Sequence, residues 1–113
     1  MEDDKRKLAE LAELCGLERK TRSDFIDDYY SHIGKDDYVS HLDKWNPLTN
    51  TEQAMIVLKA FDMWKIECVD DLYFCQISKL SERCDGYEIL GAVQLETLCE
   101  AICYACLCAK ERR

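Results

Sequence analysis

Cysteines are the residues of this chain whose type and spacing first suggest chemistry. Eight occur in 113 residues, and four of them form the run Cys99-x-x-x-Cys103-x-x-Cys106-x-Cys108. Thiolates bind zinc tetrahedrally at short ligand spacings, so this run could hold a metal ion. On a helix, however, the first three fall within about 80° of one another while the fourth points away. The pattern therefore favours cysteines that pack as small hydrophobic residues, and we expect neither a metal nor a cofactor.

A nucleophilic cysteine is the second candidate for chemistry. Cys84 stands in a polar loop beside Arg83, a neighbour of the kind that activates a thiol. A catalytic cysteine also needs a histidine base, and the chain has only His32 and His41. A glycine-rich phosphate loop, a Gly-x-Ser-x-Gly elbow and a His-Glu-x-x-His helix are all missing from the sequence. We therefore expect a protein that is not an enzyme.

The two histidines lie close to several aspartates, a composition that could hold a divalent cation. His32 and His41 are nine residues apart, which is no recognised ligand spacing. A calcium loop needs alternating acidic residues, a central glycine and a terminal glutamate, and residues 34–38 do not supply them. A solvated loop is the simpler interpretation of this segment.

The stretch from Asp24 to Asp43 is the best binding candidate in the sequence. Aromatic residues are favoured anchors at protein interfaces, and six aspartates against Lys35 alone would suit a positively charged recipient. The alternative is that the aromatic rings pack across a sheet while the aspartates face water. The candidate partner-binding residues are Asp24, Asp27, Asp28, Tyr29, Tyr30, Asp36, Asp37 and Tyr38.

The overall charge narrows the class of partner. The chain has 23 acidic and 15 basic residues, a formal net charge of −8. This balance argues against direct binding to nucleic acid or to an acidic membrane. It suits a basic protein, for instance one whose positive groove normally takes nucleic acid, although solubility alone would also explain it. No secretory signal pattern opens the chain and no apolar run reaches the length of a bilayer span, so we expect a cytoplasmic protein with free thiols.

Three helices are expected from the hydrophobic spacing. Residues 3–15 carry one apolar stripe that ends at Gly16, a left-handed C-cap. Thr49 and Glu52 form a capping box that starts a second helix, which should end near residues 62–63. A third helix is expected from about residue 93 to residue 110. Residues 17–44 show no sustained period, so we expect one or two helical turns within residues 25–33 and otherwise a long loop.

A β-hairpin is expected over residues 64–78. Apolar and polar residues alternate there on both sides of Asp70-Asp71, which we interpret as a two-residue turn. This register pairs residue 69 with 72, 68 with 73, 66 with 75 and 64 with 77, and it leaves the opposite face mixed and only partly covered. A third strand is expected over residues 87–90, broken by Gly91-Ala92. The residues that share the apolar face are Trp64, Ile66, Cys68, Tyr73, Cys75 and Ile77.

These elements predict one α+β domain over residues 1–113, with helices packed on a small antiparallel sheet of two or three strands. The expected order is α-loop-α-β-β-(β)-α: an N-terminal helix (1–16), an acidic aromatic loop region (17–48), and a helix, hairpin and C-terminal helix (49–113). The last helix carries apolar residues on two sides. Either it is covered on both, or its outer side, Tyr104, Leu107 and Cys108, mediates self-association as a homodimer.

Three segments resemble small uncharacterised proteins of tailed bacteriophages and prophages. They are the opening Leu8-Ala-Glu-Leu-Ala-Glu-Leu-Cys-Gly16, the turn and helix of residues 44–61 with Trp45-Asn-Pro-Leu-Thr-Asn50, and the closing helix of residues 96–109. The resemblance implies an α-β-α sandwich domain and a phage origin, and it carries no catalytic motif. It leads us to expect a phage accessory protein in the bacterial cytoplasm.

Three functions from different classes are expected from this combination. The first is an acidic, non-enzymatic binder of a basic host protein, for example an anti-CRISPR or another inhibitor of a nucleic-acid-binding defence effector. The alternatives are a self-associating structural or assembly protein of a phage, and a module that binds a metal or a small ligand.

Overall fold

The chain forms two small antiparallel sheets and three α-helices. The computed structural model describes residues 2–21, 28–35, 37–81, 83 and 86–112. Its elements are α1 (Glu2–Leu14), β1 (Leu17–Thr21), β2 (Asp28–His32), β3 (Ser40–His41), the 3₁₀ helix η1 (Leu42–Lys44), α2 (Thr51–Leu58), β4 (Met63–Val69), β5 (Leu72–Leu80), β6 (Tyr87–Leu95) and α3 (Leu98–Arg112). Sheet A has the order β1-β2-β3 and sheet B the order β4-β5-β6. The predicted α+β class is thereby confirmed.

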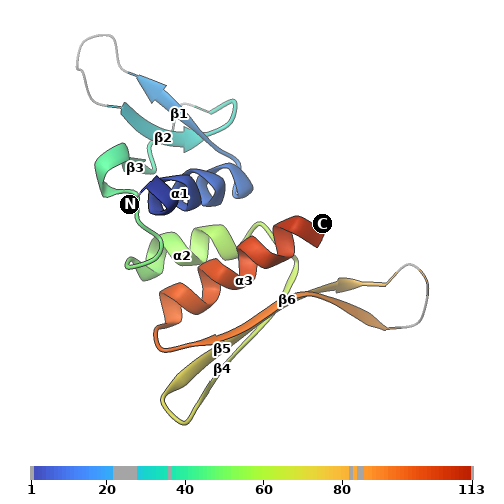
Figure 1. Ribbon diagram of the computed structural model, residues 1–113. Coiled ribbons are helices and arrows are strands. Elements are labelled where there is room, and N and C mark those ends of the chain that lie inside the picture. Colours follow the sequence, from blue (N-terminus) through green and yellow to red (C-terminus); the bar gives the residue numbers. More distant parts are fainter. Residues whose placement is uncertain (1, 22–27, 36, 82, 84–85, 113) are drawn as a thin grey trace.

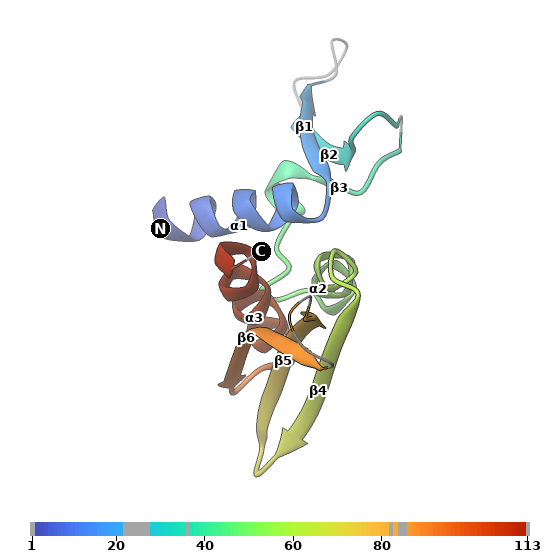
Figure 2. The same ribbon diagram turned by 90° about the vertical axis from the view of Figure 1, so that its right-hand side faces the viewer.

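The two sheets lie at opposite ends of the molecule with the helices between them (Figure 1). Sheet A contacts α1, the helices α2 and α3 form the next layer, and α3 lies on sheet B, as the rotated view also shows (Figure 2). The molecule measures 52 × 34 × 22 Å. This arrangement places helices between sheets and differs from a sheet placed between helices, the order that the phage resemblance implies.

Helix α1 and its end follow the sequence prediction. Leu11 and Ala12 are fully buried, and Gly16 has a φ of 79°. The Gly16 amide donates to the carbonyl of Glu13 at 3.1 Å, which satisfies one of the last free carbonyls of the helix. The left-handed glycine then reverses the chain into β1.

Sheet A corrects the prediction of a loop over residues 17–44. Strands β1 and β2 pair antiparallel from Leu17 opposite His32 to Thr21 opposite Asp28. The predicted helical turns are therefore wrong over residues 28–32, while residues 25–27 lie outside the described part of the chain. The signal was missed because Tyr30 and Ser31 are both buried although they are neighbours. A strand covered on both faces shows no alternation of apolar and polar residues.

Helix α2 begins one residue later than its predicted capping box. Asn50 is the N-cap, and its side chain accepts a hydrogen bond from the Gln53 amide at 3.0 Å. The side chain of Gln53 accepts from the Asn46 amide at 2.6 Å and donates to the Lys44 carbonyl at 3.0 Å. Gln53 thereby holds the turn that precedes its own helix. The helix ends at Leu58, earlier than predicted, and the chain turns over residues 59–62 into β4.

The predicted hairpin of sheet B is confirmed in its register and its turn. Strands β4 and β5 pair Trp64 with Ile77, Ile66 with Cys75, Cys68 with Tyr73 and Val69 with Leu72. The turn residues Asp70 and Asp71 have φ values of 52° and 63°. Two consecutive left-handed residues define a type I′ turn, whose twist matches that of the flanking strands.

Strand β6 is longer than predicted, and the last helix starts later. The strand runs through Gly91 and Ala92 to Leu95, and α3 begins at Leu98. Gly91 permits close packing of α3 on the sheet, because a Cβ atom there would lie 2.7 Å from the Ala105 carbonyl oxygen and 2.9 Å from the Ala109 nitrogen. The sequence prediction took this glycine for a strand breaker, whereas it marks a close backbone approach.

The main apolar core lies between α3 and sheet B and extends to α1 and α2. Cys75 and Ile77 of β5 and Ile102 and Cys106 of α3 are fully buried in it. Trp45, 2% exposed, donates from its indole nitrogen to the Leu8 carbonyl at 3.0 Å and so ties the segment before α2 to α1. Both ends of the molecule are thereby joined through the helical layers.

Candidate functional site

Five of the eight predicted partner-binding residues are described, and these five do not form one exposed surface. Asp24, Asp27 and Asp36 lie outside the described residues. Tyr30 is 8% exposed, and its ring centroid lies 5.7 Å from that of Trp45. Tyr30 is therefore a core residue, which corrects its assignment as an interface anchor.

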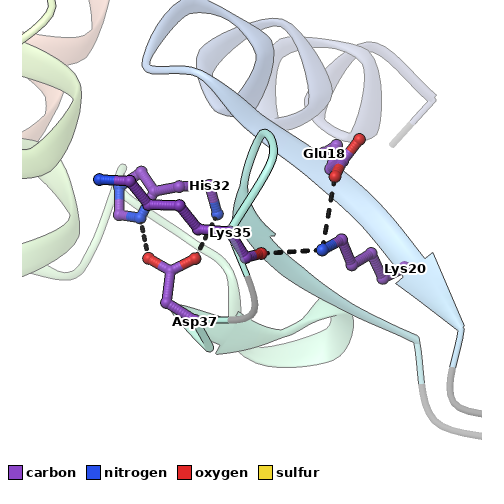
Figure 3. A network of polar contacts seen from close by, with 5 residues as sticks. All are labelled: Glu18, Lys20, His32, Lys35 and Asp37. Atoms are coloured by element: carbon purple, nitrogen blue, oxygen red, sulfur yellow. Dashed lines mark hydrogen bonds and ion pairs between the residues drawn. The ribbon is translucent and has the colours of Figure 1, made fainter.

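Two of the predicted aspartates are engaged in contacts within sheet A. Asp28 forms an ion pair with Arg19 across the β1–β2 pair. Asp37 accepts the His32 amide at 2.8 Å and contacts the ring nitrogen Nδ1 of the same residue (Figure 3). The hydrogen bond from the His32 side chain lowers the pKa of Asp37. Both carboxylates are therefore satisfied internally, and their charge is less available to a partner.

The other two tyrosines remain at the surface of sheet A. Tyr38 is 52% exposed, and its ring lies 6.0 Å from that of Tyr29 and 5.2 Å from that of His41. Nearby, Lys20 donates to the Lys35 carbonyl at 2.8 Å and pairs with Glu18 at 3.5 Å (Figure 3). This surface carries cations as well as acids, so it lacks the uniformly negative character that the sequence suggested.

The predicted self-association residues lie on a helix that is covered on two sides. Tyr104 is half-buried, and its hydroxyl accepts from Lys7 of α1 at 3.3 Å. Leu107 is half-buried and packs on the core cluster. Cys108 is exposed, yet its Cβ faces Gly91 of sheet B. Contacts within the chain thus account for most of the apolar surface of α3.

The cysteines of the core are structural residues. The seven described cysteines are free thiols, and Cys75, Cys103 and Cys106 are fully buried in the core, where the Cys103 thiol donates to the Pro47 carbonyl at 3.3 Å. Burial raises the pKa of Cys75 to about 11 and that of Cys103 to about 12, and it raises the pKa of Cys106 still further. Within the described part of the chain no three metal-ligating side chains come together. Thiols of this kind are inert as nucleophiles at neutral pH; Cys84 lies outside the described residues.

The face of sheet B that points away from α3 is an apolar surface that no described helix covers. We call it the open face; it consists of Lys65, Glu67 and Val69 of β4, Leu72, Phe74 and Gln76 of β5, and Ala92 and Gln94 of β6. Val69 is 49% exposed, and Leu72 and Phe74 are half-buried without joining the core cluster. Figures 1 and 2 show helices on one side of this sheet only, as far as the chain is described. The sequence prediction of a mixed, partly covered face agrees with this arrangement.

Acidic residues gather where the open face ends. Asp70 and Asp71 form the hairpin turn, and the pairing of Tyr73 with Leu95 places Glu96 beside it. All three are exposed, and none forms an ion pair with another described residue. By contrast, Glu67 on the same sheet pairs with Lys65 at 3.0 Å. The acidic turn therefore presents uncompensated negative charge next to the apolar row of Val69, Leu72 and Phe74.

The sequence contains a pattern that indicates this surface, but the binding surface was predicted in another segment. A type I′ turn prefers Asn-Gly, and two aspartates at this position repel each other. Their presence next to an apolar β face indicates a charged surface at the tip of the hairpin. The prediction instead placed the binding residues within residues 24–43, because aspartates are more numerous there.

Comparison with protein-family models, with curated proteins and with solved structures gave no match for this chain. None of the described helices is both long and apolar enough to cross a membrane. Functional inference therefore depends on the geometry of the chain itself.

Proposed function

We propose that this protein is a non-enzymatic binding protein that docks a basic partner protein on the open face of sheet B. The observation that carries the proposal is the row of Val69, Leu72 and Phe74, over which no described helix lies, beside the exposed acids Asp70 and Asp71. Protein interfaces combine an apolar centre with a polar rim, and this surface has both parts.

The two parts of the surface have different physical roles. Burial of the apolar row stabilises the complex and slows its dissociation. The aspartates, together with the net charge of −8, attract a positively charged partner and raise its rate of association. Such a complex should weaken with added salt, because exposed charges are screened within about 10 Å at 0.1 M ionic strength.

The resemblance of three segments to phage proteins supports a setting for this binding. In the cytoplasm of an infected bacterium, basic surfaces belong above all to proteins that handle nucleic acid. The partner in our proposal is a host protein of this kind, such as a defence nuclease, and an anti-CRISPR role is one example. The small size and acidic character of the chain are compatible with occupying a groove that otherwise takes nucleic acid.

The proposal is tested by capture from host lysate with charge-matched variants. Asp70→Asn/Asp71→Asn removes two charges, and asparagine tolerates the left-handed conformation of the turn. Glu13→Gln/Glu111→Gln removes the same charge from exposed positions on α1 and α3. We expect the natural chain and the helix variant to retain a stoichiometric, salt-sensitive basic protein, and the turn variant to lose most of it.

Equal recovery of that protein by both variants would remove the acidic turn from the proposal. A Phe74→Lys variant then tests the apolar row, because a charge at the centre of the open face blocks docking without disturbing the buried face of β5.

Self-association through Tyr104, Leu107 and Cys108 is the alternative proposal. It predicts a mass that rises with concentration in sedimentation experiments and that falls to the monomer value in Leu107→Asp. A concentration-independent monomer mass would contradict it.

A further inference from the structure

A second surface of a different kind lies between α1 and sheet A. There the structure contains a cavity of about 950 Å³, whose lining includes η1 and Trp45 of the segment that follows it. Known small-molecule pockets range from about 300 to 1,000 Å³. The cavity is therefore large enough for an organic ligand and far too large for a bare inorganic ion.

The charge of this cavity is opposite to that of the chain. Among the described side chains of its walls are three cations, Lys5 of α1, Arg19 of β1 and Lys44 of η1, and one carboxylate, Asp28. His41 of β3 adds an imidazole. In a molecule with a net charge of −8, a cavity with a surplus of two positive charges is selective for an anion.

The cations differ in how firmly they are held. Asp28 accepts from Nε of Arg19 at 2.9 Å and from one terminal nitrogen, which fixes the guanidinium while its other N–H groups remain available. Lys5 and Lys44 are exposed and form no ion pair with any described residue. The two lysine side chains can therefore change conformation to contact a ligand, while Arg19 provides a hydrogen-bond donor in a fixed position.

The remaining walls are apolar and firmly packed. Tyr30 and Trp45 are 8% and 2% exposed, and the indole of Trp45 is tied to the Leu8 carbonyl. Side chains from five different elements and from the segment before α2 thus line the cavity. This combination suits a ligand with an anionic group and an apolar or planar body.

We propose that this cavity binds a small phosphomonoester of mononucleotide size. A phosphomonoester carries close to two negative charges at neutral pH, which matches the two lysines better than the single charge of a carboxylate does. Lysine binds phosphate as a point charge, and Arg19 adds directed donors. The body of the ligand lies against the apolar wall beside Trp45.

Titration calorimetry with defined probes tests the proposal. The probes are adenosine 5′-monophosphate, adenosine, inorganic phosphate, benzoate and a soluble short-chain phosphatidic acid. We expect a phosphomonoester, the nucleotide or the lipid, to bind at least about tenfold more tightly than adenosine, phosphate or benzoate, a difference of about 1.4 kcal/mol. The phosphomonoester that binds more tightly, the nucleotide or the lipid, indicates which class of molecule carries the phosphate group.

A Trp64→Phe variant reports whether binding occurs in this cavity. The chain has two tryptophans, and Trp64 lies 42% exposed on sheet B, so the variant leaves Trp45 as the only indole. Addition of the phosphomonoester should change the emission of Trp45. Binding in calorimetry without any change in this emission would place the ligand elsewhere and overturn the proposal.

Charge-matched variants complete the test. Lys5→Gln/Lys44→Gln removes the two unpaired cations, and Lys59→Gln/Lys110→Gln removes two lysines that do not line the cavity. We expect the first to weaken phosphomonoester binding by about tenfold or more and the second by less than about twofold. Equal weakening in both variants, absence of binding by every probe, or stronger binding of benzoate would overturn the proposal. These outcomes are independent of sheet B, so they leave the proposed protein-binding function untouched.

Discussion

Sheets A and B have the same number of strands but are held together by different interactions. Sheet B has strands of seven to nine residues and lies against α3, with Cys75 and Ile77 fully buried. Sheet A has strands of five, five and two residues, an ion pair links Arg19 with Asp28, and the His32 ring contacts the Asp37 carboxylate beside it. Apolar burial is insensitive to salt, whereas exposed ion pairs are weak and screened.

This difference indicates where the molecule opens first. Free energies of local opening range from near zero to the global value, and they are lowest where few apolar contacts exist. We therefore expect sheet A to open locally while sheet B and α3 remain folded. The cavity proposed to bind a phosphomonoester lies against the less stable sheet, and the proposed protein-binding face belongs to the more stable one.

The largest expected effect is a loss of stability at alkaline pH that originates in the core beside sheet B. Burial raises the pKa values of Cys75, Cys103 and Cys106 above those of the unfolded chain, so the folded state holds these protons more tightly. The stabilisation is complete below about pH 8.5 and is lost as the pH rises through the folded-state values. Each thiol lowers the free energy of unfolding by up to about 1.4 kcal/mol per pH unit in that range.

Urea unfolding between pH 7 and 11 measures this effect. A Cys106→Ala variant serves as the control, because it removes one titrating thiol and should show a shallower decline. A free energy of unfolding that stays constant up to pH 11 would contradict the assignment of these thiols to the core.

The next effect concerns the contact between sheet B and α3. Gly91→Ala forces a Cβ atom to within 2.7 Å of the Ala105 carbonyl oxygen, so the helix must shift away from the strand. Overpacking of this kind costs about 1–3 kcal/mol, and backbone displacement places the expected value at the upper end. Gly86→Ala is the matched control, since no atom lies within 4 Å of its added Cβ and its φ is not positive. Urea unfolding of both variants measures the difference, and equal stabilities would refute the close approach.

The smallest expected effect isolates sheet A. Asp37→Asn removes the charge that contacts the His32 ring but keeps an oxygen able to accept the His32 amide. The free energy of global unfolding should change little. Relative to the natural chain, the substitution should accelerate amide hydrogen exchange in β2 more than in β5. The hydrogen bond from His32 lowers the pKa of Asp37 in the folded state. The ionised Asp37 carboxylate therefore stabilises the fold at neutral pH, and this stabilisation is lost as the pH falls below about 4. Uniform acceleration of exchange in both strands would show that the two sheets open as one unit.

Sequence reasoning succeeded where a local pattern determines structure. The alternation around Asp70-Asp71 predicted the register of sheet B, and the stripe ending at Gly16 predicted α1. Both patterns arise because one side of an element is buried and the other is not.

Sequence reasoning failed where both faces of an element are buried, or where the contacts of a residue are distant in the sequence. Tyr30 and Ser31 of β2 are both buried, so the strand showed no alternation and was taken for part of a loop. The meaning of Gly91 depends on Ala105 and Ala109 of α3, which a local pattern cannot reveal. The cavity is likewise formed by elements that are distant in sequence, and its lysines look like ordinary surface residues until η1 is placed beside α1.

The layered arrangement also makes the molecule long for its size. Its radius of gyration is 15.2 Å, whereas a compact globule of this length has about 13 Å. The open face belongs to sheet B and the cavity lies beside sheet A, and the helices separate the two sheets (Figure 1). A protein that docks on the open face would therefore leave the cavity sterically free, and we expect the two proposed ligands to bind at the same time with the helices between them.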